Sequence, residues 1–177
     1  MTLGPRWRKF ILVTHITTSA GWIGAVAVSL VLSVCGWMSS DPGLVRASYL
    51  TLLPTCQWAL VPLSLLSLAT GLIQSLLGRW GLFQHYWVVI KLLMNVGAST
   101  VLLLYTRTLS QLAGQAGAAT SEADLAMLRN PSPVLHATAA LILLLVAVVL
   151  SVYKPAGLTR HGVRRRARRG IATLSLH

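Results

Sequence analysis

The chain has 177 residues, of which 55% are hydrophobic and only 10% charged, and its mean hydropathy is +0.70. This composition excludes an ordinary water-soluble domain, whose surface needs far more charge. The 15 Lys and Arg residues outnumber the 3 Asp and Glu residues, a balance that would suit nucleic-acid binding. They lie at the ends of long apolar segments, however, where they act as topology signals and contact anionic headgroups. We therefore expect the lipid bilayer to be the partner, and no nucleic acid.

Four apolar segments are long enough to cross a hydrocarbon core roughly 30 Å thick, which takes about 20 helical residues. The predicted spans are 10–37, 56–78, 86–106 and 133–153. Backbone groups in lipid must be paired within the chain, so segments of this length are predicted to be helices. The predicted fold class is all-α, a polytopic four-helix transmembrane bundle over residues 1–157 with a basic tail over 158–177.

The first span begins like a secretory signal, with a basic start and an Ala25-Val26-Ala27 sequence that resembles a cleavage site. Its apolar run continues to Trp37, beyond the roughly 7 to 15 residues of a signal peptide, which favours an uncleaved helix. Small residues recur every fourth position along it, which predicts close helix packing: Thr17, Gly21, Ala25, Ser29 and Ser33. A turn is expected at Asp41-Pro42-Gly43, and a short amphipathic helix near Ser121 to Asp124.

Most positive charges lie on one side of the predicted topology, at the amino terminus, around Arg79 and in the tail. The positive-inside rule then places both termini in the cytoplasm, with the chain in the inner (plasma) membrane. The tail over 158–177 is expected to lie on anionic lipid headgroups, although it could instead recognise RNA or a partner. A membrane protein partner or a second copy of the chain is a further expected contact.

Ionisable residues inside a span are costly, so each one suggests a function. His15 shares a helix face with Trp22, the aromatic residue in mid-span, and Lys91 lies at a similar depth with Asn95 one turn further in. Because neighbouring helices alternate in direction, His15 and Lys91 are predicted to form one polar cluster. Alternatively, Lys91 extends to the nearby interface and rests its ammonium over Trp87.

His15 is either a neutral imidazole hydrogen-bonded within the bundle or an axial iron ligand of a haem, and it is the predicted metal ligand. His136 begins the fourth span, so it is expected on the order of 15 Å from His15 along the membrane normal. The two cannot share one iron. A second ligand would come from His85, or else His136 serves a separate site. Hydrolytic acid–base chemistry is not expected, because no predicted span contains Asp or Glu.

Cys35 and Cys56 are both predicted at the outer membrane face, one at the end of the first span and one at the start of the second. An oxidising exterior would permit a disulfide between them. Two apolar thiols that pack separately are the alternative.

The chain resembles an uncharacterised bacterial family of small four-helix integral membrane proteins at three segments: residues 15–24, 79–92 and 150–160. A first-helix histidine followed by Trp22-Ile23-Gly24, and the Trp87 to Lys91 spacing, are also similar to the copper-resistance D and membrane protoporphyrinogen oxidase families. The latter family is associated with haem b, and this resemblance implies His15 as a haem contact.

These observations predict a membrane protein that binds haem b in its bundle, with a redox or electron-transfer role next to the quinone pool. His15, Trp22, His85, Lys91, Asn95 and His136 are the candidate cofactor-binding residues. The alternatives are a non-enzymatic accessory or structural subunit and a small transporter. The spans offer little of the polar lining that a conduction path needs.

Overall fold

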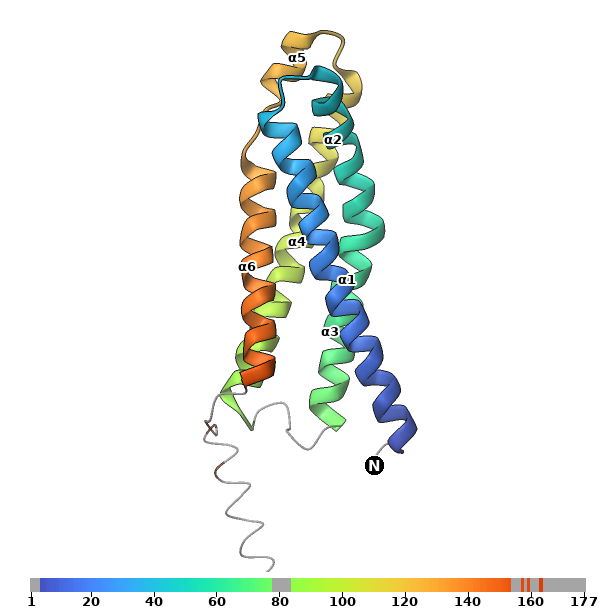
Figure 1. Cartoon of the computed structure of the whole chain (residues 1–177), viewed down its shortest axis with the longest axis vertical. Helices are drawn as coiled ribbons and strands as arrows, with labels where there is room; N and C mark the ends of the chain where they lie inside the picture. The colour runs from blue at the N-terminus through green and yellow to red at the C-terminus, as the bar shows by residue number, and fades with distance from the viewer. Residues whose placement is uncertain (1–3, 78–83, 154–156, 158, 160–162, 164–177) are drawn as a thin grey trace, which may run out of the picture.

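The computed structural model describes residues 4–77, 84–153, 157, 159 and 163. The regular elements in these residues are all helices, which confirms the predicted all-α fold (Figure 1). In chain order they are α1 (Pro5–Met38), α2 (Pro42–Thr55), the π-helical turn η1 (Cys56–Leu60), α3 (Val61–Leu77), α4 (Tyr86–Ala118), α5 (Glu122–Met127) and α6 (Ser132–Tyr153).

Four of the helical units in the described residues are long and apolar enough to cross a membrane: Pro5–Met38, Pro42–Leu76, Tyr86–Ala118 and Ser132–Tyr153. Their outward surface is rich in large apolar side chains, such as Leu104 at 65% exposure and Ile142 at 58%. Such a surface is stable against lipid tails and would aggregate in water. The chain is therefore a multi-pass membrane protein that contacts the bilayer.

The four units run up and down and form a closed ring of neighbours. Helix α1 packs against α2, α3 and α6, and α4 packs against the same three helices from the other side. The amino-terminal end of α1 lies at one end of the bundle and α5 at the other (Figure 1). We call these the N-terminal end and the α5 end.

The second and third helical units are longer than the sequence predicts. The second begins at Pro42 rather than Cys56, because Asp41 caps it by accepting a hydrogen bond from the Gly43 amide at 2.8 Å. The third continues past residue 106 to Ala118. Its added turns bury Leu109, Leu112, Ala113 and Ala116, whose spacing is that of one helix face.

Proline does not interrupt the second unit, and the helix changes its hydrogen-bond pattern between its two prolines. Pro54 lies inside α2, and Pro62 follows η1 at the start of α3. The Val61 amide bonds to the Cys56 carbonyl, five residues back, which is the π-helical pattern. The turn directs Leu60 into the bundle and leaves Trp58 82% exposed.

Small residues allow close approach along part of α1, although Thr17 of the predicted series is exposed. Gly36 lies against the ring of the buried Tyr49, so that a Cβ atom added to Gly36 would be 3.2 Å from Tyr49 Cζ, and Ser29 and Ser33 are buried. The predicted short helix near Ser121 is α5, and its capping box joins Ser121 and Asp124. Gly78, the segment around Arg79 and most of the predicted tail lie outside the described residues.

Candidate functional site

A cavity of about 310 Å³ lies inside the bundle, nearer to the α5 end than to the N-terminal end. Its wall on one side is buried and comes from Trp22, Val26, Ser29 and Ser33 of α1, with Leu52 of α2 and Leu60 of η1. The other side comes from α4 and α6. The lining is mostly apolar, and the volume is at the small end of the range for ligand pockets, roughly 300 to 1,000 Å³.

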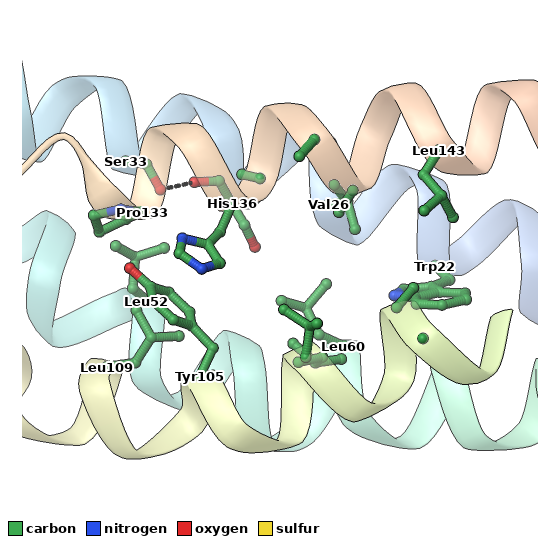
Figure 2. Close-up of a pocket in the computed structure, with 18 of the residues that line it drawn as sticks. Trp22, Val26, Ser33, Leu52, Leu60, Tyr105, Leu109, Pro133, His136 and Leu143 are labelled. Carbon is green, nitrogen blue, oxygen red and sulfur yellow. Dashed lines mark hydrogen bonds between the residues drawn. The ribbon is translucent and has the colours of Figure 1, made fainter. Parts of the chain in front are cut away.

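One end of the cavity carries an aromatic pair. The His136 imidazole of α6 stacks on the Tyr105 ring of α4, with centroids 3.9 Å apart and planes inclined by 17°. Figure 2 shows these two rings at one end, Trp22 at the other, and Leu60 and Val26 between them. A flat ring would therefore meet an aromatic or imidazole surface at both ends and aliphatic side chains between.

The aromatic pair is held by a short hydrogen-bond network at the start of α6. His136 Nδ1 lies 2.8 Å from the Ser132 carbonyl oxygen, and the Tyr105 hydroxyl lies 3.0 Å from Ser132 Oγ. The Ser132 amide in turn donates to Asn130 Oδ1 at 2.8 Å, and the Asn130 amide donates to the Tyr49 hydroxyl at 3.1 Å. The buried Tyr49 thus links the site to the packing of α2.

The cavity is closed toward α1 and open between α4 and α6. The lining residues Leu93 and Val101 of α4 are 66% and 50% exposed. Gly97 of α4 and Ala139 of α6 also line the cavity and are exposed, and a Cβ added at Gly97 would meet no atom within 4 Å. In a membrane this opening faces lipid tails, so a molecule dissolved in the bilayer can reach the cavity from the side.

The structure places His15 outside this cavity, between α1 and α3. Its Nδ1 lies 3.1 Å from Thr70 Oγ1, whose own hydroxyl donates to the Leu66 carbonyl at 2.6 Å. The Thr70 oxygen therefore accepts from His15 Nδ1, which leaves Nε2 with a lone pair. One turn further in, Ser19 Oγ and Ser67 Oγ are 2.8 Å apart, and one turn back, Gln74 Nε2 donates to the Ile11 carbonyl at 3.1 Å. His15 is thus part of a polar seam between α1 and α3.

No hydrogen bond joins Lys91 to His15 among the described residues, and the predicted cluster of the two stays a prediction. The Lys91 Nζ lies 5.7 Å from the centroid of the Trp87 ring, which is the expected cation–π contact toward the N-terminal end. Asn95 is half-buried one turn further along α4, and neither residue lines the cavity. The Lys91 ammonium thus extends toward the N-terminal end of the bundle.

His85 lies at the beginning of α4, where its carbonyl accepts the amides of Val88 and Val89 and its ring is tilted against Trp87 at 6.2 Å. Of the six candidate residues, only Trp22 and His136 line the cavity, and they lie at its opposite ends. No group of three or more His, Cys, Asp or Glu side chains that could hold a metal ion occurs among the described residues.

The two cysteines are both free thiols. Cys56 is fully buried, and its Sγ lies 3.5 Å from Thr106 Oγ1, while Cys35 is half-buried on α1. The structure therefore has the two separately packed thiols rather than the disulfide.

Tyr105 and Ser132 are site residues that the sequence analysis missed. Ser132 and His136 are four residues apart, the spacing of neighbours on a helix face, so this part of the site was readable once α6 was assigned. No sequence signal connects Tyr105 with His136, because their contact depends on how α4 packs against α6.

Comparisons with protein families, with curated proteins and with solved structures find no match to this chain.

Proposed function

We propose that this membrane protein binds a small lipid-soluble ring compound in the cavity between α1, α4 and α6. The observation that carries the proposal is the cavity itself, about 310 Å³, apolar, open toward lipid and ending at the stacked His136 and Tyr105. An apolar pocket with a few converging polar groups is the usual form of a small-molecule site. Its size suits a single ring with a short tail better than a macrocycle.

The experiment uses a bromine-substituted decylphenol, because bromine quenches indole fluorescence on contact and Trp22 lines the cavity. We expect saturable quenching of the purified protein in detergent, and loss of the saturable component in Trp22→Phe. A linear, non-saturable response in the intact protein would contradict the proposal.

A pair of glycine variants separates binding in the cavity from adsorption to the surface. Gly97 lines the cavity and Gly24 does not, and a Cβ at either position would meet no atom within 4 Å. Both Gly97→Leu and Gly24→Leu should therefore fold. We expect Gly97→Leu to weaken saturable quenching at least tenfold and Gly24→Leu to leave it unchanged. Equal quenching in the two variants would place the probe outside the cavity.

Haem b is a second candidate ligand, and the chemistry of His15 supports it. A histidine that binds a metal usually donates its other ring N–H to a fixed acceptor, as His15 Nδ1 does to Thr70. His15 Nε2 would be the axial ligand, but His15 does not line the cavity, so a haem there would need a separate space. A Soret band in protein from haem-replete cells that His15→Ala diminishes would support this candidate, and a colourless preparation would contradict it.

His136 is an alternative axial ligand for haem, and it can be compared directly with His15. Its Nδ1 also bonds to a fixed acceptor, the Ser132 carbonyl, so both histidines offer Nε2. A Soret band lost in His136→Ala but kept in His15→Ala would place the haem in the cavity. An accessory subunit without a ligand predicts neither quenching nor a Soret band, and the resemblance to the copper-resistance D and protoporphyrinogen oxidase families stays a prediction.

We further propose that the N-terminal end of the bundle faces the cytoplasm of a plasma membrane, with both termini inside and the basic tail on anionic lipid. Arg6, Arg8 and Lys9 at the start of α1 support this orientation, whereas the acidic Glu122 and Asp124 lie at the α5 end. Single cysteines at Arg8 and Glu122, in a variant lacking Cys35 and Cys56, test it in intact cells. A membrane-impermeant thiol reagent should label only the second position, and labelling of Arg8→Cys would reverse the orientation.

A further inference from the structure

The polar end of the cavity has a defined hydrogen-bonding character, set by His136. Its Nδ1 lies 2.8 Å from the Ser132 carbonyl oxygen, and a carbonyl can only accept. Nδ1 therefore carries the proton of the neutral imidazole, and Nε2 carries the lone pair. No described residue donates a hydrogen bond to Nε2 in this structure. His136 thus offers a ligand one acceptor.

The other polar groups of the cavity wall are also mainly acceptors. The Ser29 hydroxyl donates to the Ala25 carbonyl at 2.8 Å, and the Ser33 hydroxyl donates to the Ser29 carbonyl at 2.6 Å (Figure 2). Their protons are therefore used within α1, and only oxygen lone pairs remain for a ligand. One hydroxyl of the Tyr105 and Ser132 pair donates to the other, so one of their two protons is used and at most one donor remains at this end of the cavity. The indole N–H of Trp22 is a further donor at the opposite end.

The excess of hydrogen-bond acceptors over donors at this end of the cavity distinguishes between two kinds of ring compound. A ligand with a carbonyl or ether oxygen needs donors, of which the His136 end of the cavity has at most one. A ligand with a hydroxyl group can donate to His136 Nε2, which accepts a hydrogen bond from no described residue. A carbonyl or ether oxygen cannot form this hydrogen bond, so the hydroxyl should be favoured.

We propose that the cavity selects a ring compound that carries a hydroxyl group, such as a phenol or a quinol, and that this hydroxyl donates a hydrogen bond to Nε2 of His136. The inference rests on the proposed function, since it names the chemical class that the same cavity takes. His136 and Tyr105 act as a pair, because their stacking and the Ser132 contacts hold the imidazole in the orientation that exposes Nε2.

The test compares the bromine-substituted decylphenol with its methyl ether, which has the same ring, bromine and tail but no proton to donate. Both quench Trp22 directly, so their dissociation constants can be compared in one assay. We expect the phenol to bind about tenfold more tightly than the ether, the ratio that corresponds to one net hydrogen bond.

Variants of His136 test whether the preference for the phenol over the ether depends on Nε2. In His136→Phe a ring remains to stack on Tyr105 but the acceptor is gone, so the phenol should weaken about tenfold to the affinity of the ether, which should not change. His136→Gln supplies an amide oxygen and should restore part of the preference. His15→Asn, outside the cavity, should keep the full preference.

Equal affinities of phenol and ether for the unmodified protein would overturn this inference and leave binding in the cavity intact. A preference that persists undiminished in His136→Phe would also overturn it. Failure of both compounds to quench Trp22 saturably would instead overturn the proposed function.

Discussion

The imidazole of His15 lies directly against the backbone of Gly71, so that a Cβ atom added to Gly71 would be 3.1 Å from His15 Cε1. This contact joins α1 to α3 at the level of the His15 to Thr70 hydrogen bond. Membrane helices gain little from burying apolar surface, so they associate through close contacts at small residues such as this one.

Gly71→Ala should therefore destabilise the bundle by about 1 kcal/mol, because the methyl group must displace a hydrogen-bonded ring. Gly97→Ala is the matched control, since nothing lies within 4 Å of its added Cβ, and it should be neutral or slightly stabilising. Unfolding midpoints in mixed detergent micelles measure both. If the contact with the His15 ring causes the destabilisation, Gly71→Ala should not destabilise a His15→Ala variant. An equal loss of stability with and without the His15 ring would show that the contact is not the cause.

The stack of His136 on Tyr105 should contribute to stability as a pair. A double-mutant cycle with His136→Leu and Tyr105→Leu should give a coupling free energy of about 0.5 to 1.5 kcal/mol, as for other aromatic pairs. The same unfolding assay provides the four stabilities. A coupling energy indistinguishable from zero would mean that the two rings merely lie next to each other.

The effect of replacing a buried serine on stability should depend on whether its hydroxyl has a hydrogen-bond partner. Ser67 Oγ lies 2.8 Å from Ser19 Oγ across the α1 to α3 interface, whereas the hydroxyl of Ser99 has no hydrogen-bond partner in the described part of the chain. Ser67→Ala should lower the unfolding free energy by about 0.6 kcal/mol, a typical value for a hydrogen bond between membrane helices. Ser99→Ala removes an unpaired polar atom and should be neutral or stabilising. The opposite order would show that the hydrogen bonds between α1 and α3 do not hold the helices.

The stability that the Asp124 cap gives to α5 should depend on pH. The Thr120 amide above all, and then the Ser121 hydroxyl and amide, hold the pKa of the Asp124 carboxyl below its usual value. A carboxyl whose pKa is lower in the folded state stabilises the fold at pH above its unfolded pKa, and this contribution is lost as pH falls through the folded pKa. Carboxyl titration by NMR should find a lower midpoint in the protein than in a peptide of residues 119–130. Ser121→Ala should raise the midpoint in the protein, and identical midpoints in protein and peptide would exclude the capping contacts in solution.

Membrane insertion and helix number follow from the sequence alone. Four apolar segments have no alternative in lipid to forming helices, because each backbone amide must be paired within its own segment. The capping residues Asp41 and Ser121 could likewise be recognised locally. The start of the second helical unit could not, because Pro54 looks like a boundary in the sequence but lies inside α2, which continues into the π-helical turn η1.

The location of the site depended on the tertiary structure. From the sequence, His15 and Trp22 share a helix face, and that pattern favoured a site at His15. Helix α3 instead covers His15 at Gly71, while α6 brings His136 over Tyr105, a residue 31 positions away along the chain. Membrane helices are apolar on most of their circumference, so hydrophobic periodicity does not indicate which faces meet. Only the packing of small residues and a few hydrogen bonds decides that, and these contacts appear when the helices are assembled.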